Sequence, residues 1–279
     1  RFLKFSQIFY RVFYKIPIPY KYIISKATTN IRPSFKPFKE FIKNDEAILS
    51  NNEFLFLNKL IKGKPANLWN DKNIPKLWLY NLHYFNDLKL LDISREEILE
   101  DLLHNWIKNN PIGYGIGWEP YPTSIRVVNI VKWLSKKNKK NPLIINSLLQ
   151  QVRYLEKNIE YHIKGNHLFA NAKALVFAGY FFEGKEADNW LNKGIKILNY
   201  EIDEQILPDG GHFERSIMYH ALALEDILDL NNLISSNSSF FKDQKVFIKN
   251  CTKKTDAMLN FLHAMTHPDG NISFFNDSA

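Results

Sequence analysis

Apolar residues recur at three- and four-residue spacing along most of this chain, and this helical period constrains the fold more than any other feature. Leu168, Ala172 and Leu175, for example, lie on one such face. Only Asn271–Phe275 looks locally extended. The sequence therefore predicts an all-α fold. Helices are expected near the following ranges: 44–62, 94–109, 123–138, 143–163, 167–183, 186–204, 217–235 and 239–265.

Turn-forming residues separate these helical segments. No sequence repeat of fixed period is visible, which disfavours a repeat family such as the tetratricopeptide proteins. We therefore predict stacked helical hairpins that form either a toroid or a solenoid. Gly63, Pro65 and Pro75 interrupt the pattern, so a boundary is expected between an N-terminal helical arm (1–62) and the main body (63–279).

The net charge of +8 over 279 residues favours an anionic partner. The same charge also fits an ordinary solvated surface rich in Lys and Asn. No RNA-binding signature is present, so we do not expect nucleic acid as the partner. The single cysteine, Cys251, excludes an internal disulfide framework.

The N-terminal segment 1–26 is aromatic and basic, and it lacks the apolar core and cleavage site of a signal peptide. No uninterrupted apolar run reaches the roughly 18 residues that a membrane span needs. We expect this segment to form a helix that docks on the main body, although a basic amphipathic helix lying on a membrane is an alternative.

Two short segments carry most of the side chains suited to proton transfer: Gly165–Leu168 and Asp209–His220. Both place polar groups where a turn meets a predicted helix. Asn166 and His167 begin one helix, and Tyr219 with His220 begins the next. Each pair also has a structural interpretation, because Asn is a good N-cap and a buried imidazole or phenol can bind an ordinary partner.

The segment from Trp118 to Arg126 has the character of a sugar-binding rim. The rings of Trp118 and Tyr121 can stack on pyranose faces, and Arg126 can bind a carboxylate through two hydrogen bonds. The structural alternative is a proline-rich loop in which Arg126 forms an internal ion pair. Asn81–Phe85 is a similar, weaker candidate.

Several other chemistries lack their motifs. The chain contains no metal-binding His-Glu-x-x-His or Cys-x-x-Cys pattern, no phosphate-binding loop and no nucleophile elbow. Paired carboxylates for glycoside hydrolysis remain available from Glu119, Asp209 and Glu214. A toroid glycoside hydrolase therefore stays open as an alternative.

Four segments in order resemble the heparinase II/III-like polysaccharide lyases, a family that includes some alginate lyases. The resemblance implies an incomplete (α/α) toroid, normally followed by a β-sandwich domain, and β-elimination of a uronic-acid polysaccharide. It also implies export to a bacterial periplasm. We expect this chain to stop where the toroid meets the β-sandwich, either as a fragment or as a shortened relative. The segments are Trp118–Arg126, Gly165–Leu168, Gln205–His220 and Phe275–Ser278.

The resemblance also implies catalytic roles. Asn166 would neutralise the uronate carboxylate, and His167 would assist it or act as the base. Tyr219 would protonate the leaving glycosidic oxygen, and in some members the same tyrosine also takes the C5 proton. The chemistry is consistent, because the C5 proton becomes acidic only when the carboxylate charge is neutralised. A phenol near cationic groups can exchange a proton.

The expected partner is an acidic polysaccharide, and no cofactor or metal is expected within this chain. A metal or a further catalytic residue from the β-sandwich stays open. A non-catalytic glycan-binding or surface-polysaccharide assembly protein is the third hypothesis. The residues expected to bind substrate are Trp118, Tyr121, Arg126, Gln205, His212, Glu214 and His220.

Overall fold

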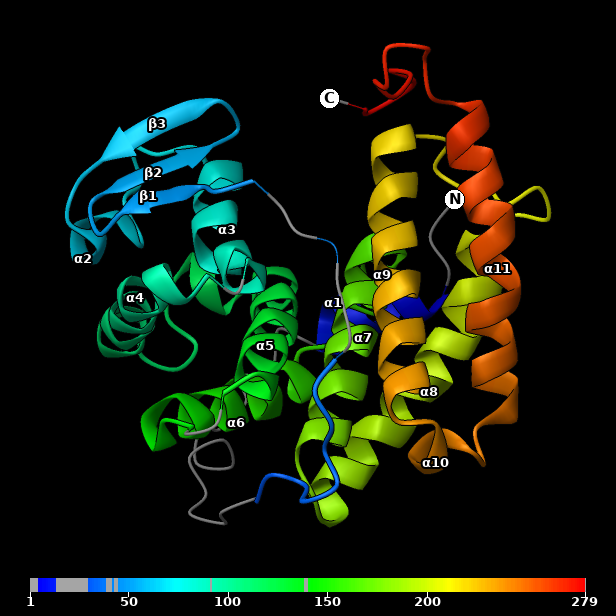
Figure 1. The fold of residues 1–279 in the computed structure, drawn as a ribbon, viewed down its shortest axis with the longest axis horizontal. Coiled ribbons are helices and arrows are strands. Elements are labelled where there is room, and N and C mark those ends of the chain that lie inside the picture. Colours follow the sequence, from blue (N-terminus) through cyan, green and yellow to red (C-terminus); the bar gives the residue numbers. More distant parts are fainter. Residues whose placement is uncertain are drawn as a thin grey trace.

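A computed structural model describes residues 5–13, 30–38, 42, 45–90, 92–137 and 140–278. Helices dominate this part of the chain (Figure 1), as the apolar periodicity predicts. The longer helices are α1 (Phe5–Phe13), α3 (Lys76–Tyr84), α4 (Glu96–Asn109), α5 (Pro120–Ser135), α6 (Pro142–Lys157), α7 (Gly165–Phe181), α8 (Lys185–Gln205), α9 (Ile217–Ser236) and α11 (Lys245–Ala264). The short helices are α2 (Pro65–Leu68) and α10 (Ser238–Phe241), with 3₁₀ turns at Asn86–Lys89, Ile93–Arg95 and Ile116–Trp118.

The main helices form two layers of an open ring. In the inner layer, α3 packs on α5, α5 on α7 and α7 on α9. In the outer layer, α4 packs on α6, and α8 packs on α11. Figure 1 shows the inner helices following one another from the blue-green end of the molecule to the yellow and orange end. This arrangement of stacked hairpins confirms the predicted incomplete toroid and excludes a β-rich or α/β architecture for the described residues.

Two glycines allow α7 and α8 to pack closely. A Cβ atom on Gly179 would lie 2.6 Å from the backbone nitrogen of Leu191, and one on Gly194 would lie 2.7 Å from the carbonyl oxygen of Ala172. Both distances are far below ordinary van der Waals contact, so larger side chains would push the helices apart. The nearly continuous burial of α7 from Leu168 onward follows from this contact on one side and from α5 and α9 on the other.

The helix predicted over 44–62 is wrong. This region forms an antiparallel sheet in which β2 (Glu53–Phe56) pairs with both β1 (Ile48–Ser50) and β3 (Lys59–Lys62). The reason is local: Leu57 and Asn58 both have positive φ angles, which turn β2 back onto β3. Within β2, Phe54 and Phe56 are buried while Leu55 is exposed, a two-residue period that the surrounding apolar residues obscured.

Other boundaries differ in smaller ways. The single helix predicted over 239–265 is two helices, α10 and α11. The sequence interpretation did not include α3, whose apolar pattern is interrupted by several polar residues. Asn141 caps α6, since its side chain accepts a hydrogen bond from the backbone nitrogen of Leu143 at 3.0 Å. The division of the chain at residue 62 stays a prediction.

The N-terminal helix α1 contacts the loop that precedes α7. The side chain of Gln7 donates to the carbonyl oxygen of His162 at 3.2 Å, and the ring of Tyr10 stacks on Tyr161 at 4.5 Å between centroids. The expected docking of a helix on the main body is therefore seen for the described part of segment 1–26. Among the helices that the structure describes, none combines the length and the apolar character that crossing a bilayer requires.

Candidate active site

A cleft of about 430 Å³ opens on the inner layer of helices, with walls from α3, α5, α7 and α9. Its volume lies in the range typical of ligand-binding sites. Four residues singled out from the sequence line it together: Tyr121 on α5, Asn166 and His167 on α7, and Tyr219 on α9. The ring arrangement brings these residues together although they are almost 100 positions apart in the sequence.

A tight turn places Asn166 and His167 at the start of α7. Lys164 and Gly165 both have positive φ angles, 67° and 56°, which turn the chain at the point where α7 begins. A side chain on Gly165 would be strained by this backbone conformation, and its Cβ would lie 3.0 Å from Oε1 of Glu214. Glycine is therefore required for the turn that aims the first residues of α7 into the cleft.

The imidazole of His167 is held from two sides. Its ring stacks on Tyr121 with centroids 4.5 Å apart, and its Nδ1 lies 3.0 Å from Oε1 of Glu160. The side chain of Glu160 is only 6% exposed, and its other oxygen accepts a hydrogen bond from Asn171 at 3.1 Å. In the part of the chain that the structure describes, Nε2 of His167 has no hydrogen-bond partner. That nitrogen is available to a ligand.

Tyr219 lies in the first turn of α9. Ser216 caps this helix, because its hydroxyl accepts from the backbone nitrogen of Tyr219 at 3.3 Å. The hydroxyl of Ser278 accepts from the first two amides of the helix, those of Ile217 and Met218, at 2.9 and 3.2 Å. The closing segment of the sequence is thus folded against the start of α9.

The surroundings of the Tyr219 phenol correct one expectation. The sequence interpretation placed cationic groups beside it, but burial and then the carboxylates of Glu214 and Asp277 raise the pKa of Tyr219 above its ordinary value. Burial and Asp277 also raise the pKa of Glu214, which supports a location of this carboxyl close to the site. At neutral pH the phenol keeps its proton and is a donor.

Buried ion pairs form the floor of the cleft. The lysine side chains of these pairs are at most 6% exposed, whereas the side chains of Glu225 and Asp226 are each about one quarter exposed. The floor therefore presents carboxylate oxygens as hydrogen-bond acceptors, and the buried lysines beneath them balance their negative charge. The sequence interpretation missed all of these residues, since isolated charges on apolar helices resemble solvent-exposed positions. The pairs are Lys89–Glu225 at 2.8 Å, Lys132–Asp229 at 2.6 Å and Lys173–Asp226 at 2.7 Å, and Lys173 also bonds Asp229.

Two residues of the predicted sugar-binding rim lie in the core, so the structure does not support direct contact of their side chains with a substrate. Trp118 is 2% exposed and donates to the carbonyl oxygen of Asn110 at 3.0 Å. Arg126 is fully buried, and its guanidinium lies 4.0 Å from the centroid of the Trp106 ring. Arg126 also does not form the internal ion pair considered for it among the described residues, because its guanidinium donates to neutral oxygens. These acceptors are Gln151 Oε1, the carbonyl groups of His83 and Gly117, and the hydroxyl of Thr123.

Gln205, His212 and His220 do not reach the cleft, so their direct substrate-binding roles are not supported. Gln205 is 1% exposed and donates to the carbonyl oxygen of Gly165 at 2.9 Å, which holds the turn before α7. Nε2 of His220 lies 3.0 Å from the carbonyl oxygen of Met258 on α11. Both side chains have structural partners that explain their burial.

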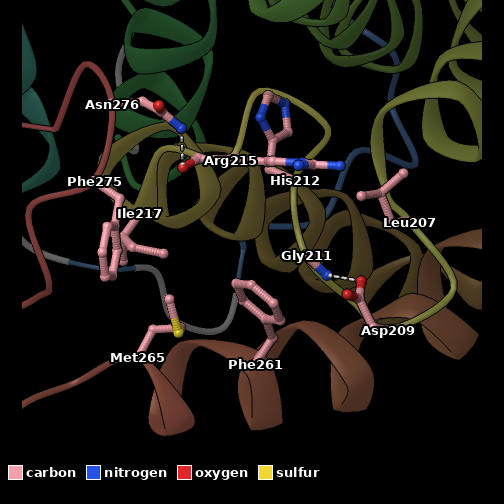
Figure 2. A pocket seen from close by; sticks show the side chains of 10 residues that line it. All are labelled: Leu207, Asp209, Gly211, His212, Arg215, Ile217, Phe261, Met265, Phe275 and Asn276. Atoms are coloured by element: carbon pink, nitrogen blue, oxygen red, sulfur yellow. Dashed lines mark hydrogen bonds between the residues drawn. The ribbon is translucent and has the colours of Figure 1, made fainter.

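His212 lines a second cavity, of about 440 Å³ (Figure 2). Its side chain is 2% exposed, and burial followed by the charge of His220 lowers the pKa of His212 to about 4. Figure 2 shows Phe261 of α11 and Met265, the residue after this helix, below the cavity and Arg215 above it. The carboxylate of Asp209 accepts from the backbone nitrogen of Gly211 at 2.9 Å, so it stabilises the turn.

The weaker candidate segment Asn81–Phe85 divides between the cleft and the core. Asn81 and Tyr84 line the cleft, together with Tyr80. His83 is fully buried, with Nδ1 accepting from the indole of Trp106 at 2.9 Å. The division follows from the helical period of α3, because Asn81 and Tyr84 are three residues apart and share one face, whereas His83 lies on another face.

Among the described residues, no three His, Cys, Asp or Glu side chains come together in a way that would hold a metal ion.

Comparisons with known proteins identify relatives of this chain. A heparin-sulfate lyase from Pedobacter heparinus is 29% identical over 62% of this chain and 28% of its own length. One from Bacteroides thetaiotaomicron is 30% identical over 64% of this chain and 27% of its own length. This chain thus matches little more than a quarter of the length of these curated relatives.

Solved structures show the same fold. The crystal structure of the heparan sulfate lyase HepC from Pedobacter heparinus aligns with a TM-score of 0.56 and 22% identity, covering 98% of this chain and 45% of that one. A heparinase III with methylated lysines aligns with a TM-score of 0.57 and 20% identity, covering 88% and 44%. The sequence profile described as Heparinase II/III N-terminus matches residues 100–279, which is more than half of the chain. The chain belongs to this heparinase II/III N-terminus family.

Proposed function

We propose that this chain supplies the toroid part of a polysaccharide lyase that cleaves a uronic-acid-containing glycan by β-elimination. One observation carries the proposal: Asn166, His167 and Tyr219 line a single cleft. They offer an amide, an imidazole and a protonated phenol within one cavity. This set of groups suits the chemistry without a metal ion.

The proposed reaction uses these groups in sequence. The amide of Asn166 binds the uronate carboxylate, so that the negative charge that develops when the C5 proton leaves is stabilised. The C5 proton passes to a base, for which His167 is the candidate in this cleft, and the C5–H electrons form the C4–C5 double bond while the bond from C4 to the glycosidic oxygen breaks. Tyr219 donates its phenolic proton to that oxygen. Its raised pKa supports the role of an acid that is protonated at neutral pH.

The proposed substrate class is a glycosaminoglycan. The curated relatives are named heparin-sulfate lyases, and the aligned structures are named heparinase III and heparan sulfate lyase. The net charge of +8 fits an acidic polysaccharide. Since the chain matches only 28% of the length of the first relative, the activity, substrate and partners of the whole protein are part of this proposal.

A glycoside hydrolase is less well supported, because the carboxylates considered for it do not share the cleft. Glu119 is bound by Lys76 at 2.9 Å and by the hydroxyl of Tyr80. Asp209 lines the second cavity, and Glu214 lies against Gly165. A hydrolase would release reducing ends without the unsaturated product, which separates the two reactions experimentally.

The test is incubation of the protein with heparan sulfate, hyaluronan and alginate while the ultraviolet absorbance of the unsaturated product is followed. We expect product from heparan sulfate, and a large loss of rate in Asn166→Ala. Asn192→Ala, at an exposed position of α8, is the matched control and should keep the wild-type rate. Binding of heparan sulfate without any product would instead favour a non-catalytic glycan-binding protein.

A further inference from the structure

We propose that Glu160 is a positioning residue that fixes His167 with its proton on Nδ1, so that the ring presents Nε2 to the substrate as a proton acceptor. This inference rests on the proposed lyase function and deepens it, because it selects between the two roles considered for His167. Nothing in the sequence marks Glu160, which lies seven positions before His167 and beyond a turn.

The orientation of Asn171 determines what Glu160 can do. The side-chain oxygen of Asn171 accepts from the backbone nitrogen of Glu160 at 2.7 Å, so its amide nitrogen must point the other way. That nitrogen donates to Oε2 of Glu160 at 3.1 Å and to the hydroxyl of Ser124 at 3.0 Å. The Ser124 hydroxyl is free to accept this bond, because its own proton goes to the carbonyl oxygen of Pro120 at 2.8 Å.

The network leaves Glu160 as an acceptor toward His167. Asn171 donates to one carboxylate oxygen, and the other lies 3.0 Å from Nδ1 of His167. A carboxylate can only accept, so the proton between the two groups belongs to Nδ1. In the neutral ring Nε2 then carries a lone pair.

The burial of the pair makes this arrangement specific. The side chain of Glu160 is 6% exposed and that of Asn171 is fully buried, whereas His167 keeps 26% exposure on the cleft side. Stacking on Tyr121 restricts rotation of the imidazole, and Glu160 occupies Nδ1, so Nε2 is the ring nitrogen left for a ligand in the cleft. A carboxylate behind Nδ1 also stabilises the imidazolium that forms when Nε2 takes a proton.

The consequence is a division of roles. His167 accepts the C5 proton at Nε2, Asn166 binds the uronate carboxylate, and Tyr219 donates to the leaving oxygen. Each proton has one origin and one destination. A phenol whose pKa is raised by burial and by Glu214 is poorly suited to remove the C5 proton at neutral pH, which supports the same division.

The test compares Glu160→Gln with wild type by ¹⁵N NMR of the His167 ring in the folded protein, at a pH where the ring is neutral. We expect the Nδ1–H tautomer in wild type. In Glu160→Gln the new amide can donate to Nδ1, so a substantial fraction of the Nε2–H tautomer should appear. Glu156→Gln, on α6 and paired with Lys193, is the matched control and should leave the tautomer unchanged.

Kinetics give the second readout. Glu160→Gln is expected to lower kcat on heparan sulfate roughly 10- to 100-fold with little change in KM. Glu160→Asp, which keeps an accepting carboxylate, should restore the Nδ1–H tautomer and part of the rate. An Nε2–H tautomer in wild type, or a wild-type tautomer and kcat in Glu160→Gln, would overturn the inference. Absence of lyase activity with the expected tautomers would overturn the proposed function and leave the positioning by Glu160 intact.

Discussion

The imidazole of His167 stacks on the phenol ring of Tyr121, with centroids 4.5 Å apart and planes inclined by 29°. Helices α5 and α7 supply one ring each, so the packing of two inner helices sets the orientation of a candidate catalytic side chain. Tyr121 covers one face of the His167 ring, whereas Glu160 contacts the ring at the Nδ1 edge.

This contact predicts different effects for two substitutions. Tyr121→Leu removes the ring and should lower kcat/KM on heparan sulfate about 2- to 10-fold, since an aromatic pair contributes about 0.5–1.5 kcal/mol. Tyr121→Phe keeps the aromatic ring and therefore the stacking contact with His167. The kcat/KM of this variant should stay within about 2-fold of wild type. Equal losses in the two variants would show that the hydroxyl matters and the stacking does not.

Arg126 is predicted to act in folding. Its guanidinium donates to Gln151 and to two buried carbonyl groups. Each buried acceptor left without a donor costs about 1–3 kcal/mol, so Arg126→Leu should lower the free energy of unfolding by at least about 3 kcal/mol. Urea denaturation measures this loss. Arg126→Lys should rescue only a minor part, because one ammonium group cannot reproduce the planar fork. A stable Arg126→Leu protein with impaired substrate binding would restore the sugar-binding role.

Buried His83 predicts a loss of stability in acid. Burial, followed by the nearby charge of Arg126, lowers the pKa of His83 to about 3 in the folded protein, compared with 6.5 for a free imidazole. The unfolded chain therefore binds a proton more readily than the folded one between these values. The stabilising contribution is complete above pH 6.5 and is lost as pH falls toward 3.

The size and source of this acid effect can be measured. One such histidine contributes a slope of about 1.4 kcal/mol per pH unit to the free energy of unfolding. His83→Gln, which keeps polar atoms for Trp69 and Trp106, should remove that part of the slope between pH 6 and about 4. His212→Gln should remove a similar part over a narrower window, because its folded pKa is about 4. An unchanged slope in His83→Gln would contradict the assignment.

The buried ion pairs under the cleft predict another large effect on stability. Lys173 bonds both Asp226 and Asp229, so Lys173→Met leaves two carboxylates without this cation. Breaking one side of a buried pair costs about 3–5 kcal/mol, which should appear as a lower urea midpoint. Lys193→Met, which removes a more exposed pair with Glu156, is the matched control and should cost about 1 kcal/mol or less. Equal losses would show that burial does not set the strength of these pairs.

The sequence was sufficient for the helices of the toroid because each buries one apolar stripe. Leu168, Ala172 and Leu175 follow the helical period, and all three are buried on α7. It was insufficient for β1–β3, because consecutive apolar residues around Phe54 obscured the two-residue period and the turn at Leu57 has no glycine.

The candidate site was predictable only where side chains follow a turn into a helix. Asn166, His167 and Tyr219 meet that condition, and they do share a cleft. Glu160 was not predictable, because its contact with His167 depends on the left-handed turn at Lys164. For Trp118 and Arg126, residue type alone did not distinguish a sugar-binding rim from a buried polar network.

The most direct test of the central claim is the rate at which the unsaturated product forms from heparan sulfate in wild type and in Tyr219→Phe. Removing the only atom that can protonate the glycosidic oxygen in the proposed scheme should lower kcat at least about 100-fold, while the thermal unfolding midpoint stays near that of wild type. Tyr114→Phe, at a side chain that is 59% exposed, is the control and should keep the wild-type rate. Full activity in Tyr219→Phe would contradict the account.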